Sequence, residues 1–218
     1  MQGRMEDRSL TALDRLLAGI DGIVRGIAAP PPIAARPYPA EHVTDAPLTA
    51  KERRRAAALM RVNHAGEVAA QGLYEGHAAV ARRPETAAHM RAAADEERDH
   101  LAWCERRLSE LEASPSLLRP FWFAGAWLIG AASGVLGDRW SLGFVAETER
   151  QVEEHLSGHL DRLPPGDRRS RAILDKMREE ERAHGTQATR AGGRELPWPV
   201  RQAMRASAWV MKRTAPRL

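Results

Sequence analysis

The sequence of 218 residues contains a single cysteine, Cys104, and few aromatic residues, which make up 5% of the chain. One cysteine excludes an intramolecular disulfide and a metal site built from several thiolates, and it fits a reducing compartment. We interpret Cys104 as a small apolar residue on a packed helix. The N-terminal segment lacks the apolar core of a signal peptide, because Asp7, Asp14 and Asp21 interrupt it. We therefore expect a cytosolic protein.

The sequence also lacks a large excess of charge of either sign, with 33 basic residues, 29 acidic residues and a formal net charge of +4. No basic run alternates with aromatic residues and no nucleic-acid-binding motif is visible, so we expect no nucleic-acid partner. The small positive excess suits an anionic partner, and we favour a phospholipid surface.

No part of the sequence reads as a strand-rich core. Hydrophobic and charged residues make up 43% and 28% of the chain, as in an ordinary globular protein, and the frequent Ala, Arg, Glu and Leu favour helices. We predict an all-α protein with one packed domain over residues 48–218. Residues 1–47 would form an N-terminal appendage, with an amphipathic helix over 9–27 followed by a proline-rich linker.

Caps and helix-breaking residues divide the predicted domain. Thr49 and Glu52 have the spacing of a capping box and mark the start of a first long helix. Pro84 would open the second. The expected elements are long helices over 49–83 and 84–113, an uncharged apolar segment over 121–137, long helices over 138–163 and 167–192, and a tail over 194–218 with a basic amphipathic helix over 199–212.

Glutamate and histidine recur at helical spacing on the second and fourth long helices. Glu97 and His100 are three residues apart and therefore share a helix face. A second Glu-x-x-His pattern lies on the fourth long helix, and one further glutamate precedes each pattern on the helix before it. Corresponding residues of the two halves are 82 or 84 positions apart, which indicates two similar helix hairpins. The six candidate metal ligands are Glu67, Glu97, His100, Glu149, Glu181 and His184.

These residue types suit a pair of divalent iron ions. Four glutamates supply the four negative charges that balance two divalent ions, and each imidazole adds a nitrogen ligand. Four buried carboxylates without metal would be very costly. One Glu from each of two helices and Glu-x-x-His from each of the others is the arrangement of the ferritin-like dimetal carboxylate proteins. We predict a four-helix bundle of this type, with an extra apolar helix between the second and third long helices.

The residues alone leave alternatives for some of the ligands. Glu96 and Glu180 lie four residues before the same histidines, so they would also face them. Glu147 and Glu153 flank Glu149 on faces that could reach the same centre. We interpret these four alternatives as surface acids, and their spacing leaves the choice open.

Two further residues lie near the first candidate ligand along its helix. His64 is about one turn before Glu67, and Tyr74 is two turns after it. Both could support the metal ligands, but ordinary core packing is the preferred interpretation.

Four segments around the candidate ligands form specific motifs: RVNHAGE over 61–67, DEERDHLAWC over 95–104, GFVAETE over 143–149 and EEERAH over 179–184. In these motifs, in their spacing and in the apolar third segment, the chain closely resembles the demethoxyubiquinone hydroxylases of ubiquinone biosynthesis. The likeness spans roughly residues 48–212. It implies a diiron monooxygenase that uses O2 to hydroxylate the ring of demethoxyubiquinol.

The resemblance also implies a role for each candidate ligand. Glu67 and His100 would hold one Fe ion, Glu149 and His184 would hold the other, and Glu97 and Glu181 would bridge them. The resemblance thus decides between the alternatives that spacing leaves open. It further picks out His155 as a histidine near the centre that is not a ligand. A tyrosine that animal relatives carry next to it is Leu156 here, so a role for that hydroxyl does not transfer.

The apolar segment 121–137 would extend about 26 Å as a helix, less than the hydrocarbon core of about 30 Å. It also carries four glycines. The residues allow a buried core helix or an element lying in one leaflet, and the bilayer-resident substrate implied by the resemblance favours the second. We expect peripheral attachment to the cytoplasmic face of the cell inner membrane, with tryptophans as interfacial anchors: Trp122, Trp127, Trp140, Trp198 and Trp209.

The expected substrates are a polyprenyl quinol and O2, and the expected partners are the membrane lipid surface and other ubiquinone-biosynthesis proteins. A homo-oligomer is compatible with the sequence. Two other functions fit parts of it. A ferritin-like iron-storage or ferroxidase protein would share the ligands but should lack the apolar segment and the tryptophan-rich tail. A non-catalytic membrane-associated scaffold would keep the apolar segment without binding iron.

Overall fold

The computed structural model of the protein describes residues 32–216, together with Asp21 and Val24. Within these residues the regular structure is entirely helical, which confirms the predicted all-α fold. The predicted helix over 9–27 lies outside the described residues apart from those two positions. The helices are α2 (Ala50–Val80), α3 (Pro84–Glu110), α4 (Arg119–Val135), α5 (Asp138–Leu160), α6 (Arg168–Arg190) and α7 (Trp198–Thr214).

The helix ends follow the local sequence. In the capping box of α2, the Thr49 hydroxyl accepts from the backbone N–H of Glu52, and the Glu52 carboxylate accepts from the backbone N–H of Thr49. Pro84 is the first residue of α3. A backbone N–H at this position has no acceptor within the helix, so its absence in proline costs no hydrogen bond. The Asp167 carboxylate caps α6 by accepting from the N–H of Ser170. The four long helices therefore end within three residues of their predicted bounds.

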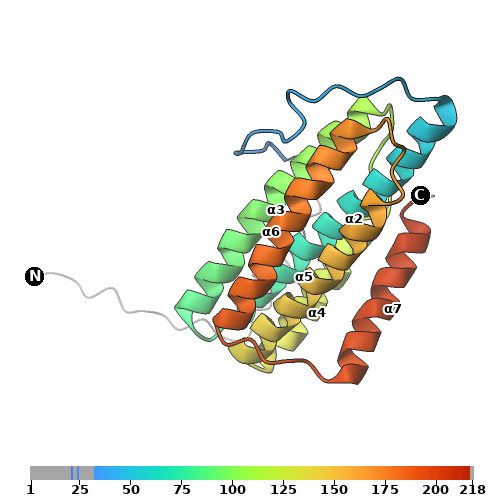
Figure 1. The fold of residues 1–218 in the computed structure, drawn as a ribbon. Helices are drawn as coiled ribbons and strands as arrows, with labels where there is room; N and C mark the ends of the chain where they lie inside the picture. The colour runs from blue at the N-terminus through green and yellow to red at the C-terminus, as the bar shows by residue number, and fades with distance from the viewer. Residues whose placement is uncertain (1–20, 22–23, 25–31, 217–218) are drawn as a thin grey trace, which may run out of the picture.

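The long helices form two hairpins that pack together as a bundle (Figure 1). α2 packs along α3, and α5 packs along α6, while contacts between α2 and α5 and between α3 and α6 join the hairpins. α4 packs on α2 before the chain enters α5, and α7 lies on the outside against α2 and α5. The extra apolar helix and the C-terminal helix thus occupy their predicted places in the chain.

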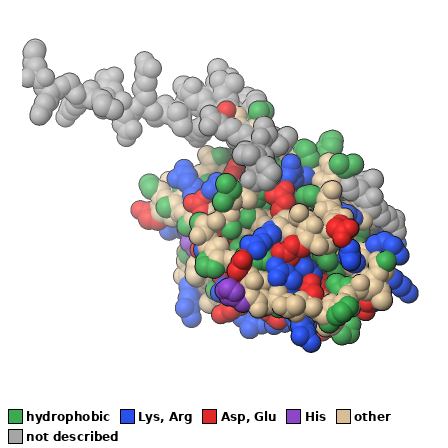
Figure 2. Space-filling view, turned by 90° about the horizontal axis from the view of Figure 1, so that it is seen from above, with side chains coloured by type: hydrophobic (Ala, Val, Ile, Leu, Met, Phe, Trp, Pro, Cys, Tyr) green, Lys and Arg blue, Asp and Glu red, His purple; other side chains and the backbone are tan. Residues whose placement is uncertain are grey.

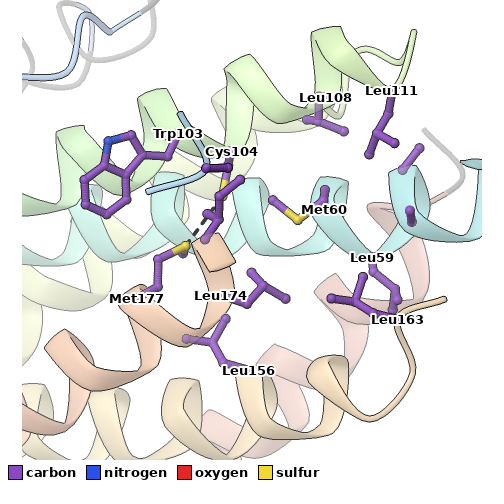
Figure 3. Packing of buried hydrophobic residues seen from close by; sticks show 14 of the residues in the cluster. Leu59, Met60, Trp103, Cys104, Leu108, Leu111, Leu156, Leu163, Leu174 and Met177 are labelled. Carbon is purple, nitrogen blue, oxygen red and sulfur yellow. Dashed lines mark hydrogen bonds between the residues drawn. The ribbon is translucent and has the colours of Figure 1, made fainter. Parts of the chain in front are cut away.

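An apolar core holds one end of the bundle together (Figure 3). Met60, Leu156 and Leu174, from three different helices, are fully buried there, and burial of each side chain contributes roughly 1.5–3 kcal/mol. The Cys104 sulfur lies 3.9 Å from the Met177 sulfur. This packing confirms the interpretation of Cys104 as a core residue.

Glycines bring α4 into close contact with α2. A Cβ atom at Gly76 would lie 2.2 Å from the carbonyl oxygen of Trp127, and a Cβ atom at Gly130 would lie 2.3 Å from the carbonyl oxygen of Leu73. Both separations are far below van der Waals contact, so the two helices can approach this closely only with glycine at these positions. Packing on α2 therefore explains Gly130 of the apolar segment.

The opposite face of α4 is exposed and apolar. Trp127 is buried against α2, so its side chain does not reach the surface as the predicted anchor would, whereas Trp198 and Trp209 of α7 are more than half exposed. In the part of the chain that is described, no helix combines the length and apolar character needed to cross a membrane. The exposed apolar residues of α4 and its C-cap are Phe121, Leu128, Ile129, Val135 and Leu136.

Residues 32–49, here called the strap, pack against α3 and α6 at one end of the bundle. The buried ring of Tyr38 lies between two guanidinium groups, 4.1 Å from that of Arg106 and 5.6 Å from that of Arg169. Asp45 accepts a hydrogen bond of 2.7 Å from the buried Arg107. Figure 2 shows basic and acidic side chains side by side on this end. The predicted linker is thus packed on the bundle in this part, and a domain boundary after residue 47 stays a prediction.

Candidate metal centre

Six carboxylate and imidazole side chains meet inside the bundle. α2 and α5 each contribute one carboxylate, and α3 and α6 each contribute one carboxylate and one imidazole. All six are buried: Glu67, Glu97, His100, Glu149, Glu181 and His184. The structure therefore brings together all six residues that the sequence singles out. Their role as metal ligands remains a prediction.

The six residues form two overlapping groups of four. In each group, one potential ligand atom per residue lies within 4.8 Å of the others. Glu97 and Glu181 belong to both groups, and the remaining residues divide into Glu67 with His100 and Glu149 with His184. Two carboxylates shared between neighbouring groups are the arrangement that a bridged pair of metal ions requires.

The Glu-x-x-His spacing turns both histidines toward the shared carboxylates. His100 Nδ1 lies 3.1 Å from Glu97 Oε2 and 3.1 Å from Glu181 Oε1. His184 Nδ1 lies 3.5 Å from Glu97 Oε1 and 3.6 Å from Glu181 Oε2. Because residues three apart share a helix face, each helix presents one oxygen and one nitrogen ligand to the same centre.

The other ring nitrogen of each histidine contacts a carboxylate of the opposite Glu-x-x-His helix. His100 Nε2 lies 2.7 Å from Glu180 Oε2, and His184 Nε2 lies 2.9 Å from Glu96 Oε2. A carboxylate that accepts from Nε2–H fixes the tautomer and leaves the Nδ1 lone pair for a metal. The interpretation of both residues as surface acids is wrong for Glu180, which is largely buried, and incomplete for the half-exposed Glu96.

Burial and mutual repulsion oppose full ionisation of the four central carboxylates. Burial raises the pKa of Glu67 and Glu149 well above the ordinary value, and the neighbouring glutamates add to the increase. Burial acts in the same direction on Glu97 and Glu181, but the nearby imidazoles of His100 and His184 help to lower their pKa overall. Burial would lower the pKa of His184, yet the nearby carboxylates of Glu181, Glu97 and Glu149 raise it to about 12. The cluster therefore attracts positive charge.

Several buried atoms of the cluster have no hydrogen-bond partner within the described residues. They are Glu97 Oε1, Glu149 Oε2, Glu181 Oε2 and His184 Nδ1. Buried polar atoms are normally satisfied, so a set of unpartnered atoms around one point indicates a missing ligand. Carboxylate oxygens with imidazole nitrogens suit iron, and two divalent ions would balance four carboxylates. The residues present therefore fit a two-ion centre.

Tyr74 and His64 differ in their relation to the cluster. The buried Tyr74 hydroxyl donates a hydrogen bond to Glu149 Oε1, so it supports a candidate ligand and is not simply a core residue. His64 is buried and has no hydrogen-bond partner in the described part of the chain, and burial lowers its pKa to about 3. Its Nε2 lies 3.9 Å from Glu105 Oε1. His64 therefore packs as a neutral core residue, as the sequence analysis preferred.

The two acids that flank Glu149 on α5 lie outside the cluster. Glu147 pairs with Arg150 at 2.7 Å, and Glu153 pairs with Arg182 at 2.5 Å. Neither is among the atoms that form the two groups. Glu149 is therefore the carboxylate that α5 contributes.

His155 lies beside another histidine. Its ring centroid is 3.8 Å from that of His159, and His159 Nδ1 lies 2.8 Å from Asn63 Oδ1. Burial lowers the pKa of His155 to about 3. Neither group of candidate ligands contains His155, and its role near the centre stays a prediction. The spacing of glutamates and histidines does not indicate Asn63 or His159, although Asn63 stands within the RVNHAGE motif.

A small cleft of about 30 Å³ opens at one side of the centre. Its lining includes Tyr74, His89, Glu96 and His184. This volume is sufficient for a water molecule. The centre is therefore closest to solvent on the side of His184.

The helices and the buried cluster together have the pattern of the ferritin-like dimetal carboxylate class, in which four bundle helices supply Glu, Glu-x-x-His, Glu and Glu-x-x-His. Comparison with known families identifies one family within this class. Residues 54–215 match the model of the family described as ubiquinone biosynthesis protein COQ7. The chain belongs to this family, as the resemblance in its motifs implied.

Curated relatives agree with this assignment over almost the whole chain. A protein of Ralstonia pickettii named 3-demethoxyubiquinol 3-hydroxylase is 52% identical, over 98% of this chain and 100% of the relative. Proteins with the same name from Nitrosococcus oceani and Xanthomonas oryzae are 50% and 53% identical, over 97% and 94% of this chain and 99% and 94% of their own lengths. The similarity therefore includes the strap as well as the bundle.

Proposed function

We propose that the protein is a diiron monooxygenase that hydroxylates the ring of demethoxyubiquinol in ubiquinone biosynthesis. The observation that carries the proposal is the pair of buried ligand groups sharing Glu97 and Glu181, in a chain that belongs to this family. One oxygen atom of O2 would enter a ring C–H bond, and the other would leave as water. Two electrons and two protons from an external reductant complete the balance.

Each central side chain has a role in this proposal. Glu67 and His100 would hold one iron ion, Glu149 and His184 would hold the other, and Glu97 and Glu181 would bridge them. When bound, the iron pair supplies the redox chemistry that activates O2. The four carboxylates keep the buried centre neutral once the two ions are present.

The surrounding residues orient the proposed ligands. Glu180 accepts from Nε2–H of His100, and Glu96 accepts from that of His184, so both imidazoles present Nδ1 to the centre. Tyr74 directs its hydroxyl at Glu149 and restricts the rotation of that carboxylate. Bulky apolar neighbours such as Trp103, which is 2% exposed, exclude water from the centre.

We also propose peripheral attachment to the cytoplasmic face of the inner membrane through the exposed face of α4. Support comes from large apolar side chains that face solvent there, including Phe121 and Leu128, which are 72% and 58% exposed. Contiguous exposed apolar residues favour a lipid or protein partner. A polyprenyl quinol resides in the bilayer, so attachment would bring the enzyme to its substrate.

Turnover of a demethoxyubiquinol with a short prenyl chain tests the proposed reaction. The protein is loaded with ferrous iron without oxygen, then supplied with reductant and isotopically labelled O2, and the quinol is analysed by mass spectrometry. We expect one labelled oxygen in the product, and a decrease of at least about 100-fold in Glu149→Gln. Glu153→Gln, one turn further along the same helix, should retain activity. Oxidation of excess ferrous iron without quinol hydroxylation would instead indicate a ferroxidase.

A further inference from the structure

The two histidines of the centre are supported unequally. Both contact a carboxylate through Nε2, but the Glu180 side chain is 13% exposed whereas that of Glu96 is 47% exposed. Glu180 is also paired with Arg36 at 2.7 Å and with Lys176 at 3.1 Å. Within the described residues, no Arg or Lys pairs with Glu96. Two cationic side chains therefore hold the carboxylate that bonds to His100, whereas the more exposed carboxylate that bonds to His184 is not held in this way within the described residues.

Arg36 connects the strap to this fixed carboxylate. Its Nη1 donates to Glu180 at 2.7 Å, its Nε donates to Asp99 at 2.5 Å, and its Nη2 donates to the backbone carbonyl of Glu96 at 3.3 Å. The guanidinium carbon lies 4.9 Å above the ring of Trp103. One side chain from outside the bundle thus ties α3 to α6 directly over the centre.

The Trp103 contact gives Arg36 a second connection to the same ligand. The Trp103 ring centroid is 5.3 Å from that of His100. Arg36 therefore covers a side chain that packs on His100 and also holds the carboxylate that bonds to it. Among the residues that the structure describes, no comparable connection reaches His184, which lines the solvent cleft with Glu96.

The strap is anchored independently of Arg36, so it presents this side chain from a fixed backbone. The backbone N–H of Ala35 donates to Asp99 at 2.7 Å. Further along, Tyr38 lies between Arg106 and Arg169. A guanidinium held from both ends loses less entropy when it binds two carboxylates than a free side chain would.

We propose that Arg36 is a positioning residue for the metal centre: by holding Glu180 against His100, it makes the half of the centre with Glu67 and His100 bind metal more tightly than the half with Glu149 and His184. The inference rests on the proposed two-ion centre. The physical reason is that a fixed acceptor on Nε2 keeps Nδ1 directed at the metal, whereas the exposed Glu96 does so only part of the time. Loss of such an outer partner typically weakens metal binding by about 10–100-fold.

Calorimetric titration of the metal-free protein with cobalt(II) tests this asymmetry. We expect two ions per chain with unequal affinities in the wild type. Arg36→Gln should weaken the tighter site by about tenfold, bringing the two affinities together, whereas Glu96→Gln should weaken the looser site and move them apart. Arg36→Lys keeps the charge but cannot bridge two carboxylates in one plane. Its affinity at the tighter site should therefore lie between those of the wild type and Arg36→Gln.

Arg53→Gln is the matched control, because Arg53 pairs with Glu112 on exposed surface, at a distance from the centre in the fold. It should leave both affinities unchanged. Thermal unfolding of each metal-free variant separates loss of positioning from loss of folding. If Arg36→Gln does not fold, Glu180→Gln provides the same comparison, with the same convergence of affinities expected.

Unchanged affinities in Arg36→Gln, or an equal decrease at both sites, would overturn the role of Arg36 while leaving the two-ion centre intact. A wild-type protein that binds no cobalt(II) would instead overturn the proposed centre itself. The two failures are therefore distinguishable in one titration series.

Discussion

The interior of the bundle and the outer face of α4 depart from the usual distribution of residues in opposite ways. The interior contains four carboxylates that are at most 2% exposed, whereas the outer face presents Phe121 and Leu136 at 72% and 61% exposure. Charged groups are rarely buried unless they are paired or bind metal, and large apolar patches are rarely exposed without a partner. Each region is therefore incomplete in the isolated chain.

The comparison shows what kind of partner each region requires. The interior requires compact positive charge, because two histidines do not neutralise four carboxylates. The outer face of α4 requires an apolar surface and carries no ligand groups. We propose metal ions as the partner of the interior and lipid as the partner of the outer face, so substitutions at each should have separable effects.

The largest expected effect comes from removing a carboxylate that both ligand groups share. Glu97→Ala should abolish hydroxylation and reduce the iron content of the protein at both positions, because Glu97 belongs to both groups. Iron analysis and activity are measured together, with Glu153→Ala as the control. Loss of activity with full iron content would contradict the ligand role of Glu97.

The position of this site was largely predictable from local geometry in the sequence, whereas the choice among neighbouring glutamates rested on the resemblance in the motifs. The three-residue spacing of Glu97 and His100 guarantees a shared helix face, and its repetition at Glu181 and His184 identifies the matching helix. The contacts of Glu96 and Glu180 were not predictable, because each reaches a histidine on the opposite helix. Such contacts depend on the relative placement of α3 and α6, which spacing within one helix does not specify.

The next largest effect concerns the outer face of α4. Leu128→Arg should reduce sedimentation with phosphatidylglycerol and phosphatidylethanolamine vesicles by at least about tenfold, because a charged group in the hydrocarbon region costs roughly 2.5–3.5 kcal/mol. Leu128 is 58% exposed, so the bundle should remain folded. Ile33→Arg, at a 93% exposed apolar position on the strap, is the matched control and should not change sedimentation. Equal binding of wild type and Leu128→Arg would contradict attachment through α4.

The inner face of α4 should be less tolerant than its outer face. Gly76→Ala places a methyl group 2.2 Å from the Trp127 carbonyl oxygen, so α2 and α4 must separate. We expect the free energy of unfolding to fall by about 1–3 kcal/mol in denaturant titrations. Gly158→Ala, where a Cβ meets no atom within 4 Å, should instead stabilise α5 by about 0.5–1 kcal/mol. A stabilised Gly76→Ala variant would show that the helices are not in close contact.

The packing of α4 and the strap was less predictable than the metal centre. Gly130 of the apolar segment was visible in the sequence, but the close contact of α4 with α2 also depends on Gly76, which no pattern in the apolar segment indicates. The prolines of the strap correctly indicated irregular structure, yet the contacts of Arg36 and Tyr38 connect residues far apart in the chain. Composition describes the local backbone and does not identify such distant partners.

A further expected effect concerns pH. Burial lowers the pKa of His77 to about 4, below the value of about 6.5 in the unfolded chain. The unfolded state therefore binds the proton first, and stability present above pH 6.5 is lost as the pH falls toward 4. His77→Leu should lessen the loss of stability between pH 7.5 and pH 5 by roughly 2 kcal/mol in metal-free protein. If the free energy of unfolding changes by the same amount between pH 7.5 and pH 5 in His77→Leu as in the wild type, His77 does not contribute to this pH dependence.

The iron content of the purified chain after anaerobic ferrous loading tests the central claim most directly. Excess metal is removed by gel filtration, and iron and protein are measured on the same sample. The buried ligand groups predict about two iron ions per chain in the wild type and in Glu153→Gln, and fewer in Glu149→Gln. A wild-type value near zero, or equal iron content in Glu149→Gln and Glu153→Gln, would contradict the assignment of the buried cluster as a diiron centre.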